Sequence, residues 1–123
     1  MILKISTSGN VTIHELPEEY DKRHRFFVKL IGNGCYGIQE ANINKLASHL
    51  DIDNVVLLVD TEGFSKALPY NIHAMQFYED SYNLGLVGDV LFVGLIVKSD
   101  RTIDYGDIPD AAFEKLMEFY RIH

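Results

Sequence analysis

The chain has 123 residues, of which 47% are hydrophobic, enough for one domain with a single core. Its 18 acidic and 11 basic residues give a formal net charge of −7, which repels phosphate backbones and disfavours direct nucleic-acid binding. The longest apolar runs have about 5 to 8 residues where a membrane span needs roughly 20, so we expect no membrane-spanning segment.

The first element in chain order is a hairpin. Alternating apolar residues stand on both sides of the turn formers TSGN, and this period of two predicts strands at 2–6 and 11–15. The N-terminus shows neither the basic region nor the apolar block of a secretory signal. We therefore expect no such signal.

A helix is expected next, because the hydrophobic period changes after Pro17. Tyr20, Phe27 and Ile31 lie near one helical face, and acidic residues follow the proline, where a helix dipole favours negative charge. A Gly-Asn-Gly sequence can end the helix. This pattern predicts a helix over 17–32, and its basic KRHR cluster is interpreted as a solvated face.

The middle of the chain mixes weak and strong signals. The segment CYGIQEANI permits a short strand at 35–41, although Gly37 weakens it. Residues 44–50 fit one or two helical turns. The run VVLLV is apolar on both faces and predicts a central strand at 55–60.

The stretch VDTEGFSKALPYN then raises the choice between a ligand loop and a corner. Asp60 and Gly63 have the chemistry of a hairpin turn, which predicts a returning strand at 64–68 that Pro69 stops. We interpret the stretch as a corner.

The last third of the chain continues in the same mixed manner. Asn71 is placed to cap a helix at 71–82, whose apolar residues fall at helical spacing. The run DVLFVGLIVK predicts the central strand at 89–98, the segment 100–107 is interpreted as an acidic turn, and a final apolar stripe predicts a helix at 107–121. The whole chain, 1–123, is thus expected to form a single α+β domain with a mainly antiparallel sheet and about three helices.

Residues that could carry chemistry are scattered. The five histidines show no metal-ligand spacing, and the glycine pairs do not open a helix as phosphate loops do. Cys35 is the one cysteine, so it forms no internal disulfide, which favours a reducing cytoplasm, and it is interpreted as a semi-buried thiol. We expect no cofactor, no metal and no catalytic set.

Two sites remain as hypotheses. Asp60, Glu62 and His73 flank the same bend and could form an acid/base pocket for a small molecule or nucleotide. The aromatic segment AMQFYEDSYN is the other candidate, because tyrosine tolerates a half-wet interface. This segment predicts a homodimer contact or partner site, or side chains that only cover the sheet, with these residues: Phe77, Tyr78 and Tyr82.

The order of motifs between residues 55 and 121 resembles a known family. VVLLVDTEGFSKALPYN, then GLVGDVLFVG and a terminal helix, are similar to the domain-of-unknown-function family 3846 of bacteriophages and bacterial mobile elements. Residues 44–53 look like an added segment. The matching positions are Val59, Asp60, Glu62, Gly63, Leu68, Pro69, Asn71, Gly88, Asp89, Val90 and Gly94.

The resemblance implies a phage or prophage accessory protein in the bacterial cytoplasm. It supplies no enzymatic activity that could be assigned to this chain. With the acidic charge and the many tyrosines and phenylalanines, it favours a non-catalytic module that binds a host or phage protein, as an inhibitor or decoy. The alternative is a small-molecule or nucleotide-binding protein or an enzyme.

Overall fold

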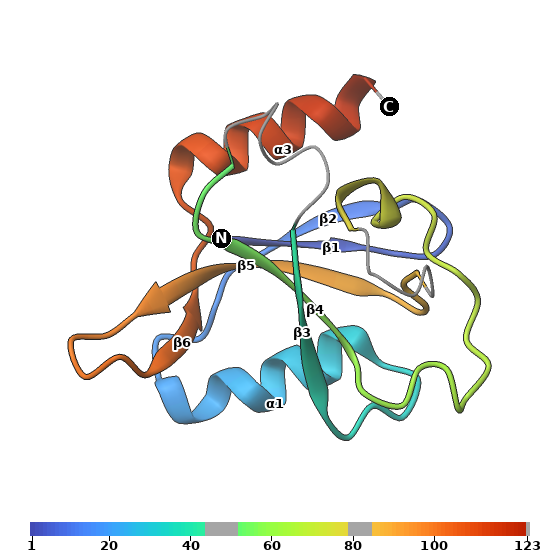
Figure 1. The fold of residues 1–123 in the computed structure, drawn as a ribbon, viewed down its shortest axis with the longest axis horizontal. Coiled ribbons are helices and arrows are strands. Elements are labelled where there is room, and N and C mark those ends of the chain that lie inside the picture. Colours follow the sequence, from blue (N-terminus) through green and yellow to red (C-terminus); the bar gives the residue numbers. More distant parts are fainter. Residues whose placement is uncertain (44–51, 79–84, 123) are drawn as a thin grey trace.

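The computed structural model describes residues 1–43, 52–78 and 85–122, and these residues form an antiparallel sheet with a helix on each face (Figure 1). The α+β class is therefore confirmed. Within the described residues, the sheet has six strands. The strands are β1 (Ile2–Ile5), β2 (Val11–His14), β3 (Ile38–Asn42), β4 (Val55–Asp60), β5 (Val90–Val97) and β6 (Ile103–Gly106).

Strand β5 is the centre of this sheet. The strand order is β2-β1-β5-β4-β3, and β6 also pairs with β5. Gly94 is opposite Val55 of β4 and Gly106 of β6, so β6 and β4 flank β5 on opposite sides. All pairs are antiparallel. Because a helix also covers each face of the sheet, the first five residues of β5 are buried whichever face they lie on, which explains the apolar start of the run VLFVGLIV.

Alternate residues of each central strand enter two separate cores. Phe92 of β5 packs in the core that lies under helix α3 (Asp110–Ile122), together with Leu116. Leu91 packs in the core that lies under helix α1 (Tyr20–Ile31), together with Phe27. The period of two along the strands thus separates the two layers of side chains.

Both α-helices begin three residues later than expected. Helix α1 begins at Tyr20 and ends before Gly32, whose φ of 69° is left-handed and whose N–H bonds to the Val28 carbonyl. Glycine adopts this conformation without strain, as the sequence predicted for this end. Helix α3 begins at Asp110, directly after Pro109.

The helix predicted at 71–82 is wrong. The described part of that range contains only a short 3-10 turn, η1 (Met75–Phe77), and residues 79–84 lie outside the described residues. Tyr70 forms an isolated bridge to Val87, and the Asn71 N–H bonds to the Leu86 carbonyl. These contacts fix residues 70 and 71 beside the segment that leads into β5, and the described residues 71–78 form turns and a 3-10 turn in place of the expected α-helix.

The strand predicted at 64–68 is also wrong, because residues 61–67 form consecutive turns. Ala67 has a φ of 54°, and the Leu68 N–H bonds back to the Gly63 carbonyl at 3.2 Å. Strand β3 begins at Ile38 and not at residue 35. The segment 100–107, expected to be an acidic turn, begins with a turn, but its residues 103–106 form strand β6. The helical turns expected at 44–50 lie outside the described residues.

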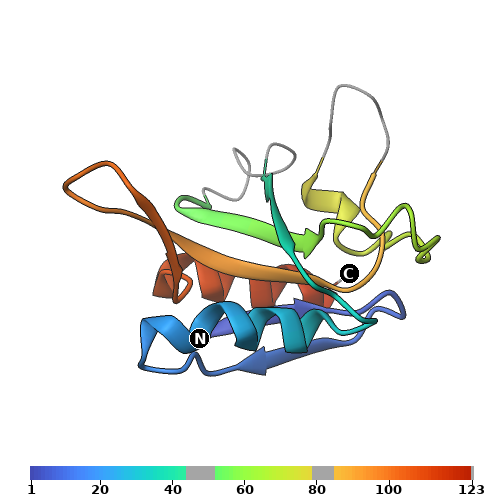
Figure 2. The same cartoon turned by 90° about the horizontal axis from the view of Figure 1, so that it is seen from below.

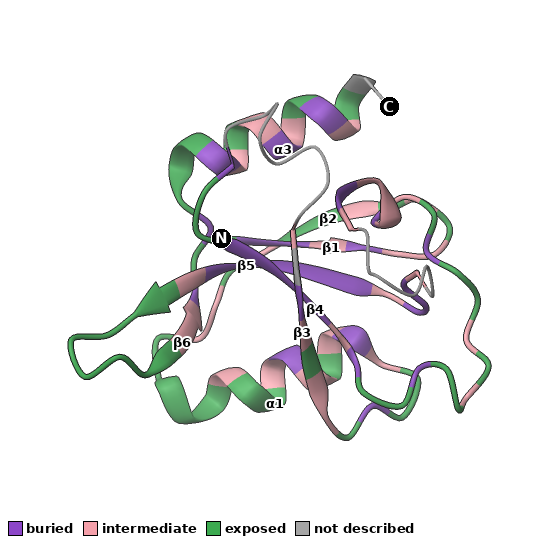
Figure 3. Cartoon of the chain, viewed as in Figure 1, coloured by how far each residue is buried: buried purple, intermediate pink, exposed green. Residues whose placement is uncertain are grey.

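The two ends of the sheet differ in shape. The β5–β6 hairpin extends beyond the helices at one end, whereas the loops around residues 61–72 gather at the other end (Figure 2). Burial follows this division, since the middle of the sheet is buried and both ends carry exposed residues (Figure 3).

Candidate protein-binding surface

The corner after β4 is held by the carboxylate of Asp60. Asp60 is buried, its Oδ1 accepts a hydrogen bond from the Glu62 backbone N–H at 2.9 Å, and its Oδ2 lies 2.7 Å from Lys66 Nζ. The same ammonium donates to the Gly34 carbonyl at 3.1 Å. The hydrogen bond to Asp60 raises the pKa of Lys66, so Lys66 stays protonated at neutral pH. The ion pair therefore ties the turn after β4 to the loop after α1.

Cys35 lies beside this corner as a buried thiol. Burial raises the pKa of Cys35, and the negative charge of Asp60 raises it further. The Sγ atom donates to the Gly37 carbonyl at 3.3 Å. These surroundings disfavour the nucleophilic thiolate, and Cys35 is more buried than the semi-buried thiol that the sequence predicted.

The three predicted pocket residues occupy different places. The Asp60 carboxylate is engaged by Lys66, and Glu62 is exposed in the following turn. The His73 ring packs beside Gly9 of the first hairpin, with its Nε2 only 2.8 Å from where a Cβ on that glycine would lie. Within the described part of the chain, no hydrogen bond or ion pair joins the His73 ring to either acid. The bend does not assemble an acid/base pair.

The predicted interface residues also separate. Phe77 is fully buried, and its ring packs against Phe92 and Phe119 with centroid distances of 5.5 and 4.7 Å. Phe77 therefore belongs to the core and offers a partner no surface. Tyr78 is partly buried against the same core. Tyr82 lies outside the described residues.

A groove of about 280 Å³ runs between the edge strand β3 and the loops at this end. Its walls mix carboxylate and amide groups with aromatic and aliphatic side chains. Neither Glu62 nor His73 lines it. The lining residues are Gln39, Glu40, Ala41, Val59, Asp60, Thr61, Phe64, Tyr78, Gly85, Leu86 and Val87.

Four large apolar side chains project from the loops beside this groove, and we call them the loop-end surface. Tyr36 is 85% exposed, Ile72 63%, Tyr70 59% and Phe64 53%. Lone exposed apolar residues are ordinary on protein surfaces. Here, however, four of them occur on neighbouring loops at one end of one sheet, and a grouping of this kind is typical of an interaction site.

Backbone hydrogen bonds hold these loops together. The Thr61 N–H bonds to the Gly37 carbonyl at 3.0 Å, which joins the segment of Phe64 to that of Tyr36. The Gly88 N–H bonds to the Pro69 carbonyl at 2.9 Å. The exposed side chains thus project from segments that are fixed to one another.

Asn71 anchors the same loops to the sheet. It is fully buried, and its Nδ2 donates to the carbonyls of Ile5 at 2.9 Å and Gly88 at 3.0 Å. Its Oδ1 accepts from the Ala74 N–H at 3.0 Å, which is the capping contact expected from the sequence, although it caps a turn and not an α-helix. One side chain therefore joins the first hairpin, the loop before β5 and the turn before η1.

The sequence-based prediction missed Tyr36, Phe64 and Tyr70 as surface residues. The sequence did contain a signal for their exposure, since each of them is adjacent to a glycine or a proline in a turn-forming stretch. Large apolar side chains in such stretches cannot follow the period of a strand or helix into the core.

The opposite end of the sheet, the hairpin end, has its own exposed apolar residues. Val97 and Ile103 pair across the β5–β6 hairpin, and both are exposed. Tyr20 is exposed nearby, with the Arg23 guanidinium 4.3 Å and the Lys98 ammonium 5.6 Å from its ring centroid. Cations over the ring occupy part of this apolar surface.

Neither a metal centre nor a membrane span is found in ranges 1–43, 52–78 and 85–122. No group of three or more His, Cys, Asp or Glu side chains there could hold a metal ion. No helix in those ranges has the length and apolar character needed to cross a bilayer. Comparison with known proteins yields no match to a family model, a curated protein or a solved structure.

Proposed function

We propose that this protein is a phage- or prophage-encoded accessory protein that binds a host or phage protein through the loop-end surface and catalyses no reaction. The observation that carries the proposal is the exposure of Tyr36, Phe64, Tyr70 and Ile72 on interlinked loops. Aromatic residues are enriched at the centres of protein interfaces, where tyrosine is among the strongest contributors to affinity.

The phage origin rests on the resemblance of residues 55–121 to family 3846. The motif residues Asp60 and Asn71 have structural roles, since they hold the loops that carry the exposed side chains. A family defined by such residues preserves a loop scaffold, and the exposed positions on it can vary with the partner. The bacterial cytoplasm is the compartment that follows from this origin.

The charge of the chain restricts the partner. With a net charge of −7, long-range steering favours a partner whose contact region is neutral or basic. Glu62 is exposed two residues before Phe64 and adds a negative charge beside the loop-end surface. These properties fit an inhibitor or decoy whose target, a host factor, has an apolar patch surrounded by basic residues.

The alternative, a small-molecule or nucleotide site near Asp60, Glu62 and His73, has less support. A carboxylate that is already bonded to Lys66 has little capacity left for a ligand, and the His73 ring packs elsewhere. The groove along β3 is the better candidate for such a ligand, but it also borders Phe64 and so forms part of the proposed protein-binding region.

The test compares a triple variant at the loop end with a double variant at the hairpin end, by affinity capture from lysates of bacteria with and without phage. Variant one carries Tyr36→Ser, Phe64→Ser and Tyr70→Ser at the loop end. Variant two carries Val97→Ser and Ile103→Ser at the hairpin end. We expect one protein to be recovered stoichiometrically with the wild type and variant two, and at least about tenfold less with variant one, as for loss of interface anchors.

Each variant is first checked by circular dichroism and thermal melting, and the interaction is repeated with purified partner by calorimetry. Equal recovery with the loop-end variant would place the partner elsewhere. Recovery of bait alone under all conditions would reject protein binding as the function.

A further inference from the structure

Strand β2 forms an outer edge of the sheet. In the strand order it is the last strand on its side, and among the described residues it pairs with β1 alone. Its sequence, VTIH, begins with three β-branched residues, and both Thr12 and Ile13 are exposed. Such an edge presents a row of backbone groups to which another strand can bond.

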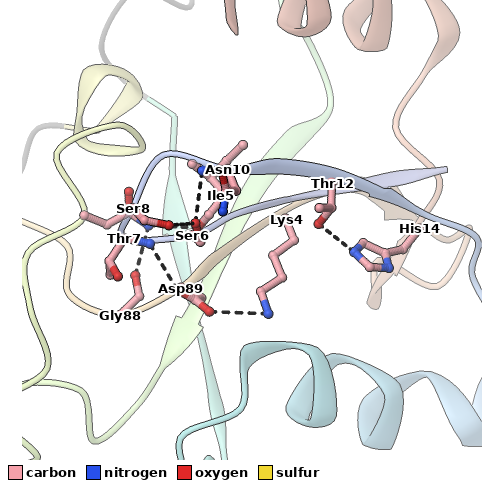
Figure 4. A network of polar contacts seen from close by, with 11 residues as sticks. Lys4, Ile5, Ser6, Thr7, Ser8, Asn10, Thr12, His14, Gly88 and Asp89 are labelled. Atoms are coloured by element: carbon pink, nitrogen blue, oxygen red, sulfur yellow. Dashed lines mark hydrogen bonds and ion pairs between the residues drawn. The ribbon is translucent and has the colours of Figure 1, made fainter.

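The turn of the first hairpin shows which backbone groups point outward. The Ser6 N–H bonds to the Asn10 carbonyl at 3.0 Å, so these two residues form a hydrogen-bonded pair (Figure 4 shows the hairpin). In an antiparallel ladder, hydrogen-bonded pairs alternate with pairs that are not bonded, so Thr12 bonds to Lys4 of β1. The N–H and C=O groups of Val11 and Ile13 therefore point away from the sheet.

This edge lacks the features that usually prevent an exposed edge strand from pairing with a strand of another molecule. Val11, Thr12 and Ile13 carry no charge, and the strand has neither a proline nor a bulge. Lysines, prolines and bulges are the usual protection of a sheet edge. Among the described residues, no hydrogen bond joins the outward groups of Val11 or Ile13 to the rest of the chain.

An apolar notch lies beside the edge on the side of α3. It has a volume of about 270 Å³ and is lined by Val11, Met117, Tyr120 and Arg121. Val11 pairs with Ile5 and Ile13 with Leu3, and both of these β1 residues belong to the core under α3. The Val11 and Ile13 side chains thus lie on the same face of the sheet as the notch, and Ile13 is 46% exposed there.

We propose that β2 pairs with β2 of a second copy of this chain, antiparallel about a two-fold axis through Thr12. In this register, Val11 lies opposite Ile13 of the second copy, and the two residues exchange backbone hydrogen bonds. Directly opposite side chains in an antiparallel pair are close neighbours. The exposed Ile13 of each copy therefore fills the notch beside Val11 of the other, and one sheet continues through both copies.

The second copy is favoured over an unrelated strand because the edge is self-complementary. Each copy offers both the exposed isoleucine and the notch, and the two-fold axis brings both pairs together at once. The absence of charge on Val11, Thr12 and Ile13 lets two chains of net charge −7 meet at this point. This contact is independent of the loop-end surface, which lies at the turns beyond the strands.

The first test is sedimentation velocity of the wild type and two lysine variants over a range of protein concentrations. Ile13→Lys introduces a charge next to Arg121 of the other copy, and we expect it to raise the dimer dissociation constant by about tenfold or more. Ile103→Lys is the matched control, because Ile103 is also an exposed isoleucine on a strand. The control is expected to dimerise like the wild type.

A second test addresses the register and does not depend on the folding of the lysine variant. Residues opposite each other in a non-bonded antiparallel pair have Cα atoms about 4.5 Å apart, which a disulfide can span. Thr12→Cys should therefore cross-link two copies rapidly in oxidised glutathione. Thr102→Cys, exposed in the β5–β6 turn, is the control and should cross-link slowly.

Any of three results would overturn the proposal. The first is a wild-type chain that sediments as a monomer at every concentration, and this result would leave the edge to a strand from another protein. The second is a Thr12→Cys variant that cross-links no faster than Thr102→Cys. The third is a dimer that survives Ile13→Lys unchanged, which would place the contact on a different surface.

Discussion

At the scale of single residues, Asn71 shows how a buried amide can organise a whole end of a sheet. Both donors of its Nδ2 and its Oδ1 acceptor are used, and the side chain is fully buried. A buried amide is tolerated when its hydrogen bonds are made, and it then selects one arrangement of the segments that it joins.

We predict that Asn71→Ala lowers the free energy of unfolding by about 2 to 4 kcal/mol, because the carbonyls of Ile5 and Gly88 lose their donor inside the protein. Urea denaturation followed by circular dichroism measures the change. Asn10→Ala, at an exposed turn position, is the control and should change stability by less than about 0.5 kcal/mol. A similar value for both variants would contradict the anchoring role of Asn71.

At the scale of elements, the segment that joins β6 to α3 passes close to β5 because residue 94 of β5 is a glycine and has no side chain. A Cβ on Gly94 would lie 1.9 Å from the carbonyl oxygen of Asp107 and 3.3 Å from that of Gly106. Both contacts are with backbone, which cannot rotate away as a side chain can. The glycine in the apolar run therefore marks a close approach of two chain segments, one of the two explanations that such a residue suggests in a strand.

We predict that Gly94→Ala costs more than about 3 kcal/mol or prevents folding, because the segment after β6 must move away from β5 and α3 moves with it. Thermal unfolding measures the loss. Gly37→Ala is the matched control, since its nearest neighbour would be the Thr61 hydroxyl at 3.4 Å, an ordinary contact. An equal and small effect of both substitutions would mean that the approach at Gly94 is easily relaxed.

At the scale of the whole molecule, two partly buried tyrosines link stability to alkaline pH. Burial raises the pKa of Tyr105 to about 12, with its hydrogen bond to Glu40 adding to the effect. Burial also raises the pKa of Tyr120, which donates to the His73 carbonyl at 3.0 Å. The folded chain therefore keeps these protons at pH values where the unfolded chain, with tyrosine pKa near 10, releases them. The raised pKa of Lys66 acts in the same direction.

We predict that the free energy of unfolding falls as the pH rises above about 9, where the Cys35 thiol of the unfolded chain begins to ionise, and that it falls more steeply between pH 10 and 12, where the tyrosines of the unfolded chain ionise. Urea titrations at fixed ionic strength across this range measure the slope. Tyr120→Phe removes one of the linked protons, so it should flatten the slope while lowering stability at neutral pH by about 1 kcal/mol. Tyr36→Phe, at an exposed ring, should leave the slope unchanged. A slope that Tyr120→Phe does not alter would show that this hydroxyl ionises equally in both states.

Elements with a strong local pattern were predictable from the sequence. Strand β4 has the predicted bounds, and the first hairpin, α1, β5 and α3 differ from prediction by only a few residues. Local chemistry was sufficient here, because apolar period, glycine and proline act within one element. The capping contact of Asn71 was foreseen for the same reason.

The elements and burial patterns that the sequence did not predict are determined by contacts between segments that lie far apart in the sequence. The residues of β6 have the local sequence of an acidic turn. They form a strand because β5 supplies the partner edge. The segment after Asn71 has helical spacing, yet the bonds of that residue to Ile5 and Gly88 hold it as loop. The same contacts determine which aromatic residues are buried and which are exposed, so Phe77 lies in the core and Tyr36 in solvent. Periodicity describes one element at a time, whereas pairing and burial depend on the free energy of the whole chain.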